Sequence, residues 1–302
     1  MKRIIYVCLM ILISITFVAL VACHPEKQKG EYIIDAKAVS GLLAQENTVL
    51  VDTQKSTEYK EKHIDGAVNI SRSHIVVNKP YPNMLAPADQ VAEILGLRGI
   101  GNDTRVVIYD NNNNMDAARL WWTLLVYGHT NAKVVSGGLA ALEAAGFEVN
   151  ANRVATTPVT FTISVKNKEY IASTGEVKNQ VDNPDPNVCI IDTRSQEEYN
   201  DGTIPGSLHI NYTSNNFKDG TYRPVRQIKI LYREAGIKPD ETSIMYCKSS
   251  IRATQTFLAM YNAGYRNLKV YDAAWLGWSD DSSLPVYRPS GEKVQATVQD
   301  GS

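Results

Sequence analysis

One long internal repeat constrains the fold of this chain more than any other feature of its sequence. The segment Val51–Ile70 aligns without gaps with the segment Ile191–Ile210, and Asp, Thr, Glu, Tyr, Ile and Gly recur in register. The matches continue downstream, where Gly128 corresponds to Gly264. The two copies together span most of the chain, whereas solenoid repeats are only about 20–50 residues long, so this period indicates a duplicated domain.

Inside each repeat, short apolar runs alternate with helical patterns. We predict strands at residues 48–51, 106–109, 188–191 and 243–246. We predict helices at residues 88–98 and 225–235, each with a proline near its first turn and a glycine just past its end. This alternation predicts an α/β fold in which each domain has a mainly parallel sheet with helices on both faces.

The repeat and the composition around it divide the chain. A Thr- and Val-rich stretch with Pro158 separates the two repeats and is typical of an extended linker. The predicted segments are a signal peptide at 1–22, a tether at 23–30, an N-terminal domain at 31–150, a linker at 151–168, a C-terminal domain at 169–290 and a tail at 291–302.

The N-terminal segment has the pattern of an export signal. Two basic residues precede an uncharged run from Ile4 to Ala22. The segment Leu20–Cys23 resembles the lipobox of bacterial lipoproteins, which implies that Cys23 is the lipidation site. An uncleaved membrane anchor is the alternative, because ~19 apolar residues could just span a bilayer. Both readings place the protein in the bacterial cell envelope on the periplasmic side, and His24 after the cysteine favours the outer membrane.

If the signal is cleaved, Cys189 and Cys247 are the thiols that remain, so no disulfide framework is implied. Cys189 lies in an apolar strand pattern and is expected in the core. Cys247 directly follows a predicted strand, and small polar residues separate it from a predicted helix. This layout would place its sulfur among backbone N–H groups at a helix N-terminus, where a thiolate is stabilised.

These motifs resemble the rhodanese family, and specifically its tandem-domain sulfurtransferases, which act on thiosulfate or 3-mercaptopyruvate. The residues that carry the resemblance are Asp192-Thr193-Arg194, Glu198-Tyr199, Ile204–Ser207, Tyr246-Cys247 with a six-residue loop ending at Arg252, Tyr271-Asp272 with Trp275 and Trp278, and, in the first repeat, Val107–Asp110 with Ala117–Trp122. The resemblance implies that Cys247 attacks a small anionic sulfur donor, becomes a persulfide and passes the sulfur to cyanide or a thiol. No metal or organic cofactor is expected.

The first repeat has Asp110 where the second has Cys247, and Asn111–Asn114 replace the small loop. A carboxylate cannot carry a transferable sulfur. We therefore expect the N-terminal domain to be a non-catalytic scaffold that closes the cleft.

Five residues around the cysteine are the predicted substrate-binding set: Lys248, Ser249, Ser250, Ile251 and Arg252. The Lys248 ammonium would attract an anionic donor or belong to the solvated surface. The two serine hydroxyls would bind substrate or only stabilise the loop. Arg252 would contact a bound anion or fix the loop through an ion pair with Asp192 or Glu198.

Three residues are predicted to support the loop: Asp192, Arg194 and Glu198. Arg194 is expected to be a buried ion-pair partner, because an unpaired buried charge is costly. Glu198 stands where the thiosulfate enzymes carry an anion-binding arginine, and Ser250 stands where the family usually has glycine. These departures leave the choice of donor open.

Two other functions fit parts of the pattern. One is a non-catalytic lipid-anchored module that carries sulfur on Cys247 or binds a partner. The other is a cysteine-dependent phosphatase, whose loop holds five residues between cysteine and arginine where this chain has four. A formal net charge of −1 gives no case for a nucleic-acid partner.

Overall fold

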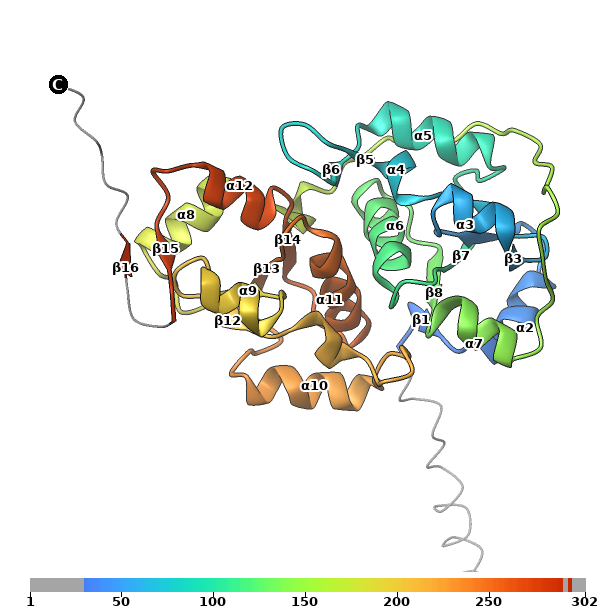
Figure 1. The fold of residues 1–302 in the computed structure, drawn as a ribbon. Coiled ribbons are helices and arrows are strands. Elements are labelled where there is room, and N and C mark those ends of the chain that lie inside the picture. The colour runs from blue at the N-terminus through green and yellow to red at the C-terminus, as the bar shows by residue number, and fades with distance from the viewer. Residues whose placement is uncertain (1–29, 290–292, 295–302) are drawn as a thin grey trace, which may run out of the picture.

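The computed structural model describes residues 30–289 and 293–294. The predicted signal peptide, the predicted lipidation site Cys23 and most of the predicted tail lie outside these residues. The described chain forms two domains side by side, each with a central sheet (Figure 1).

Every strand pairing in the two central sheets is parallel. The N-terminal sheet has the order β1 (Ile33–Ile34), β8 (Ala132–Val135), β7 (Arg105–Tyr109), β2 (Thr48–Asp52) and β4 (Val68–Asn69). The C-terminal sheet has the order β10 (Ile171–Ala172), β14 (Leu268–Tyr271), β13 (Thr242–Tyr246), β11 (Val188–Asp192) and β12 (Leu208–His209). The equivalent order confirms the predicted α/β fold with two repeated domains.

Helices flank both sheets. Those of the N-terminal domain are α2 (Val39–Leu43), α3 (Ser56–Glu61), α4 (Arg72–Ile75), α5 (Ala88–Leu97), α6 (Met115–Val126) and α7 (Gly138–Ala144). Those of the C-terminal domain are α8 (Thr174–Asp182), α9 (Gln196–Asp201), α10 (Val225–Glu234), α11 (Ile251–Asn262) and α12 (Ala274–Asp280). The predicted helices and strands are confirmed, with ends that agree to within one residue.

Short elements complete the two domains. Antiparallel pairs join β3 (His63–Ile64) to β9 (Val149–Asn150), β5 (Val76–Val77) to β6 (Met84–Leu85) and β15 (Val286–Tyr287) to β16 (Lys293–Val294). Single 3-10 turns lie at η2 (Ala36–Ala38), η3 (Lys168–Tyr170) and η4 (Tyr212–Asn215).

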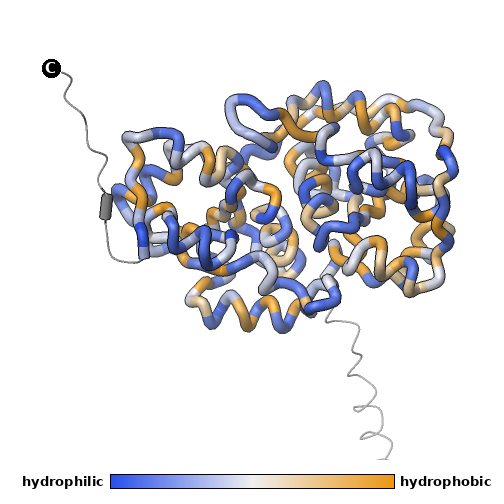
Figure 2. The backbone as a smooth tube through the Cα atoms, in the orientation of Figure 1, coloured by the Kyte–Doolittle hydropathy of each residue, from blue (hydrophilic) through white to orange (hydrophobic). Residues whose placement is uncertain are grey.

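The side chains of β13 show how each sheet is buried on both faces. Ile244 and Tyr246 point to the face that packs with Trp278 of α12. Met245 points to the opposite face, which α10 and α11 cover. Figure 2 shows hydrophobic and hydrophilic residues alternating along α10, whose buried residues are Ile228 and Tyr232. Such runs of apolar residues that face both ways are typical of parallel sheets.

One hydrophobic core extends through both domains. Its buried residues include Trp122 and Leu125 of α6 and Phe257 and Met260 of α11. Because α6 and α11 occupy the same position in the two repeats, the domains pack through equivalent helices. The carboxyl ends of both sheets, where reactive loops of parallel sheets lie, are therefore held in a fixed relation to each other.

The segment 151–167 contains no helix or strand. It lies against the N-terminal domain, where the Val159 N–H donates to the Gly96 carbonyl at 3.0 Å and the Asn167 N–H donates to the Val126 carbonyl at 2.7 Å. In the part of the chain that the structure describes, no helix has the length and apolar character needed to cross a bilayer.

Candidate active site

Cys247 lies directly after β13, and three residues separate it from α11. The last of them, Ser250, has φ of 60° and ψ of −9°, in the left-handed region that non-glycine residues rarely adopt. This turn brings the start of the helix back beside the end of the strand. The predicted strand, loop and helix are confirmed. The conformation at residue 250 is one that glycine adopts more readily than any other residue.

The first repeat shows what such a loop binds. Asp110 follows β7, and its carboxylate accepts hydrogen bonds from four backbone N–H groups. The donors are Asn112 and Asn114 at 3.0 Å each, Asp116 at 2.9 Å and Ala117 at 3.1 Å. Burial, together with the nearby Asp116 charge, raises the pKa of Asp110 to about 6, although the N–H groups oppose the rise. The N-terminal loop is therefore an anion-binding nest that its own side chain fills.

The C-terminal loop also turns back before its helix, but more tightly. The N–H of Ile251 donates to the Ser249 carbonyl, two residues earlier, at 3.0 Å, whereas the N–H of Met115 donates to the Asn112 carbonyl, three residues earlier, at 3.0 Å. The helices that follow have twelve residues each. The N-terminal loop is longer by a single position, so the alignment of the two repeats has a gap at this point.

Aligned on the starts of the two helices, three nest donors have counterparts in the second repeat: Ser250, Arg252 and Ala253. Among the described residues, no atom accepts a hydrogen bond from the backbone N–H of any of these three. These N–H groups stand where the first repeat holds a carboxylate. They are the groups available to stabilise negative charge on the Cys247 sulfur.

Arg252 is fixed by Glu198. Its two terminal nitrogens donate to the two carboxylate oxygens at 2.5 and 2.8 Å. The hydrogen bonds from Arg252 hold the pKa of Glu198 at about 2, against the effect of burial. Burial alone would lower the pKa of Arg252, but Glu198 and the Cys247 thiolate raise it above its ordinary value. Of the two acidic partners considered for Arg252, the structure selects Glu198.

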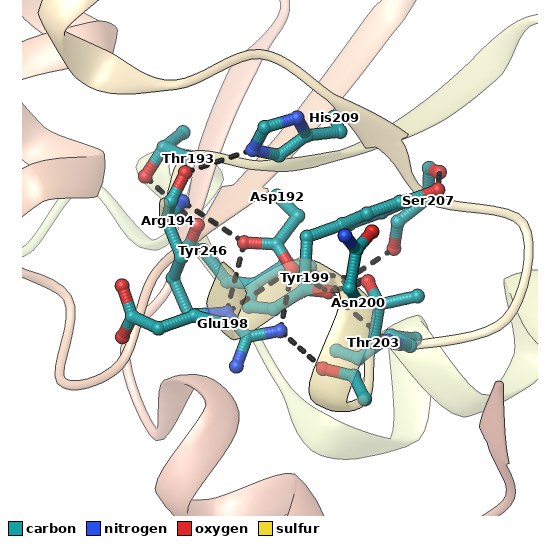
Figure 3. A network of polar contacts seen from close by, with 12 residues as sticks. Asp192, Thr193, Arg194, Glu198, Tyr199, Asn200, Thr203, Ser207, His209 and Tyr246 are labelled. Atoms are coloured by element: carbon teal, nitrogen blue, oxygen red, sulfur yellow. Dashed lines mark hydrogen bonds and ion pairs between the residues drawn. The ribbon is translucent and has the colours of Figure 1, made fainter. Parts of the chain in front are cut away.

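Asp192 and Arg194 form a buried ion pair, and Figure 3 shows the polar network around them. The Arg194 guanidinium donates to the Asp192 carboxylate at 2.6 Å and to the Gly202 carbonyl at 2.5 Å. The Tyr246 hydroxyl donates to the same carboxylate at 2.9 Å. The Arg194 guanidinium also lies 4.4 Å from the ring centre of Trp275. Arg194 is thus a structural ion-pair partner, as predicted.

The N-terminal domain reaches the catalytic loop through Arg119 of α6. This side chain is fully buried and donates to the Ser250 hydroxyl at 3.0 Å, to the Asp272 carboxylate at 2.9 Å and to the Asn83 carbonyl at 2.9 Å. The Ser250 hydroxyl in turn donates to Asp272 at 2.9 Å. The backbone N–H of Leu85 donates to the second Asp272 oxygen at 2.7 Å. The turn before α11 is therefore held from the other domain.

The positions equivalent to Arg119 and Asp272 in the other half of the molecule carry neutral side chains. Gln255 of α11 is the counterpart of Arg119, and its amide donates to Asn216 at 2.9 Å. Ser136 is the counterpart of Asp272, and its hydroxyl accepts a hydrogen bond from the Tyr222 N–H at 2.8 Å. The charged pair occurs on the side that holds the cysteine.

The predicted substrate-binding residues differ from one another in exposure and in hydrogen-bond partners. Lys248 is exposed at the loop and Ser249 is half-buried, and the Ser249 hydroxyl accepts a hydrogen bond from the Asn83 amide at 2.9 Å. The Ser250 hydroxyl accepts a hydrogen bond from Arg119 and donates one to Asp272, which fits the loop-stabilising one of its two predicted roles. The Ile251 side chain is buried and its N–H donates to the Ser249 carbonyl. Substrate binding through these two residues stays a prediction.

Sequence reasoning missed Arg119 and Asn83. A signal for Arg119 was present, because it is the one charged side chain within the apolar run Ala117–Val126. A charge at a buried helix position needs a partner. Nothing in the local pattern marks Asn83, whose side-chain amide finds its partner, Ser249, in the other domain. No group of metal-ligating side chains occurs among the residues described.

This chain is similar to known proteins along most of its length. The family model described as a rhodanese-like domain matches residues 35–145 and 173–281. A Mycolicibacterium smegmatis protein named as a thiosulfate sulfurtransferase is 26% identical over 273 residues, which cover 85% of this chain and 98% of that protein. A Schizosaccharomyces pombe protein named as a 3-mercaptopyruvate sulfurtransferase is 27% identical over 296 residues, which cover 87% of this chain and 98% of that protein.

A solved structure has the same fold at lower identity. The anaerobic ergothioneine biosynthesis enzyme from Chlorobium limicola, in complex with trimethyl histidine, matches with a TM-score of 0.76 and 21% identity over 84% of this chain and 69% of that chain. Each matched segment contains four strands of one central sheet and begins just after the remaining strand, β1 or β10, and relatives that align over most of the chain are named sulfurtransferases. This chain therefore belongs to the rhodanese family, as a protein with two tandem rhodanese-like domains.

Proposed function

We propose that this protein is a sulfurtransferase that moves a sulfane sulfur from thiosulfate or 3-mercaptopyruvate to a small thiol or cyanide through a persulfide on Cys247. The observation that carries the proposal is the pair of equivalent loops. The first loop uses its N–H groups to hold the Asp110 carboxylate, and the second offers equivalent N–H groups to the Cys247 sulfur.

The chemistry balances without an external oxidant or reductant. The Cys247 thiolate attacks the outer sulfur of thiosulfate, a new S–S bond forms, and sulfite leaves with the electron pair of the broken bond. With 3-mercaptopyruvate the C–S bond breaks instead, its electron pair goes to carbon, and that carbon takes up the thiol proton so that pyruvate leaves. An acceptor thiolate or cyanide then attacks the outer sulfur of the persulfide, and the electron pair of that bond returns to Cys247. Both steps develop negative charge on the Cys247 sulfur or beside it, where the free N–H groups stabilise it.

The burial of Cys247 supports a small acceptor. The residue is only 1% exposed, so its sulfur is accessible to a small molecule and not to the surface of a folded partner. The exposed Lys248 ammonium would attract an anionic donor to the loop. Relatives named for thiosulfate and for 3-mercaptopyruvate both align over most of the chain, so the two donors stay open.

The location is also proposed. Export with a lipid on Cys23 would hold both domains at the periplasmic side of the envelope, with the tether at 23–30 between lipid and fold. Metabolic labelling with a palmitate analogue, lost in a Cys23→Ser variant, tests this. Label that persists in the variant would exclude lipidation at this residue.

Intact mass spectrometry of the full chain tests the function. Treatment with thiosulfate or mercaptopyruvate should add one sulfur atom to the wild-type protein and to a Cys189→Ser control. A Cys247→Ser variant should gain none. If neither donor adds mass to the wild type, the proposed persulfide does not form.

Turnover separates the enzyme from its alternatives. A carrier module would take up one sulfur and then show no catalytic cycle with cyanide. A phosphatase would need the loop arginine for phosphate, but here Glu198 holds both terminal nitrogens of Arg252. Steady-state thiocyanate formation, without hydrolysis of an aryl phosphate, is the expected result.

A further inference from the structure

A polar pocket of about 590 Å³ opens in the N-terminal domain beside the catalytic loop. It lies at the carboxyl ends of β2 and β7, and its wall includes the β5–β6 turn. Asn83 lines the pocket, and its amide donates to the Ser249 hydroxyl at 2.9 Å. The rim of the pocket therefore touches the loop two residues after Cys247.

The lining of this pocket selects for a polar ligand. Apart from Val76 it consists of hydroxyl and amide side chains and two ion pairs. The pairs are Lys55 with Glu58 at 3.3 Å and Arg72 with Asp116 at 2.6 Å. A volume of this size holds a small organic molecule up to about the size of a tripeptide.

Arg72 is the cation in this lining that is held in place for a ligand. Its Nε donates to Asp116, and the Asn112 amide fixes the other oxygen of that carboxylate at 2.8 Å. Among the described residues nothing accepts a hydrogen bond from the two terminal nitrogens of Arg72, and the side chain is 34% exposed. A guanidinium fixed in this way presents a planar donor pair that fits a carboxylate.

The two arginines that support the loop from the C-terminal domain are already paired. Arg252 is bonded to Glu198 through both terminal nitrogens, and Arg194 is buried against Asp192. A carboxylate on a sulfur substrate would therefore find its fixed arginine across the domain junction. The exposed Lys248 adds a mobile charge at the loop itself.

We infer that this pocket binds the carbon skeleton of a carboxylate-bearing sulfur substrate, with Arg72 as its carboxylate ligand. The inference rests on the proposed sulfur transfer and names the substrate class. Two sources share this chemistry, an acceptor such as a small peptide thiol and a donor such as mercaptopyruvate. In the acceptor case its thiolate attacks the outer persulfide sulfur, a new S–S bond forms on the acceptor, and the electron pair returns to the Cys247 sulfur.

The test compares Arg72→Met with Arg226→Met, an exposed arginine on α10, in the full chain. Glutathione and its diethyl ester serve as acceptors with thiosulfate as donor. We expect Arg72→Met to lower kcat/KM for glutathione by about tenfold or more, because a charge-assisted contact is lost. The preference for glutathione over the ester should disappear in this variant and persist in Arg226→Met. An unchanged preference in Arg72→Met overturns the acceptor assignment.

The donor arm uses mercaptopyruvate and thiosulfate with cyanide as acceptor. A loss with mercaptopyruvate that exceeds the loss with thiosulfate assigns the pocket to the donor. If both arms are unaffected by Arg72→Met, the pocket does not bind substrate through this residue. Arg72→Lys keeps the positive charge but loses the planar pair of donors. It should therefore cause an intermediate loss of kcat/KM in whichever assay, acceptor or donor, Arg72→Met affects.

Calorimetric titration with S-methylglutathione separates this inference from the proposed function, because binding needs no persulfide. Binding to the wild type that weakens in Arg72→Met and not in Arg226→Met supports the site even if no donor adds sulfur to Cys247. Equal binding to all three proteins refutes an acceptor site at Arg72, whether or not the protein transfers sulfur.

Discussion

The contact between Arg119 and the catalytic loop gives the sharpest test of how the N-terminal domain takes part. We expect Arg119→Gln to slow sulfur transfer strongly in protein that is still folded. Arg119 is fully buried, and it donates three hydrogen bonds, to Ser250, Asp272 and Asn83. Glutamine is the residue that the other repeat uses at this position, as Gln255.

The expected loss of stability follows from the charge left behind. Without the guanidinium, the Asp272 carboxylate keeps the Leu85 N–H and the Ser250 hydroxyl but has no counter-charge. Breaking a buried ion pair by removing one partner costs about 3–5 kcal/mol. In Arg119→Gln/Asp272→Ser both charges are gone, and the two residues match those of the other repeat. We expect urea denaturation to show that the double variant recovers about 1–3 kcal/mol relative to Arg119→Gln.

Activity should not recover with stability. Arg119 and Asp272 hold the Ser250 turn, which lies between Cys247 and the N–H groups at the start of α11. A shift of about 1 Å in such a loop can cost on the order of 10²-fold in rate. We expect both variants to lose about 10–100-fold in kcat, and iodoacetamide should alkylate Cys247 more slowly in both. The reasoning is refuted if the double variant alkylates and turns over like the wild type.

Two further predictions concern the loop and its support. Ser250→Ala should destabilise the protein more than Ser250→Gly, by about 1 kcal/mol in urea denaturation, because alanine loses the hydroxyl and keeps the left-handed strain while glycine removes the strain; equal losses would contradict this. Glu198 has its pKa lowered to about 2, so its contribution to stability is present above the ordinary glutamate pKa and is lost as the pH falls toward 2. The Glu198→Gln variant lacks this carboxyl group, so its melting temperature should fall less between pH 5 and pH 2 than that of the wild type. Identical pH profiles of the melting temperature would contradict this prediction.

The sequence predicts much of the fold because the same pattern of strands and helices occurs in both copies of the repeat. Strand and helix ends agree to within one residue, since each apolar run is bounded by a proline, a glycine or a polar loop in both copies. The loop after β13 is predicted for the same reason, because Asp110 and Cys247 occupy one position. The ion pairs of Arg194 and Arg252 follow from the cost of burying a charge without a partner.

The contacts between the domains could not be predicted in this way. A repeat fixes positions within a domain and says nothing of how two copies pack. The Ser250 hydroxyl and the Asn83 amide therefore received no cross-domain partner from the sequence. The backbone of the loop was also out of reach, because the Ile251 N–H turns back to Ser249, and the Ala253 N–H has no acceptor among the described residues. This arrangement of backbone N–H groups depends on the left-handed conformation of Ser250.

The reciprocal contacts give the N-terminal domain a structural role at the Cys247 loop. The β5–β6 turn carries Asn83 to the Cys247 loop, and in the other direction the Asn114 amide donates to the Gly220 carbonyl at 2.7 Å. Each domain thus covers the strand–helix loop of the other. The Asp110 carboxylate fills the nest of the first loop and takes the place of an external anion. The N-terminal domain still supports the second loop through its packing, so loss of the N-terminal fold would also remove the contacts that hold Ser249 and Ser250.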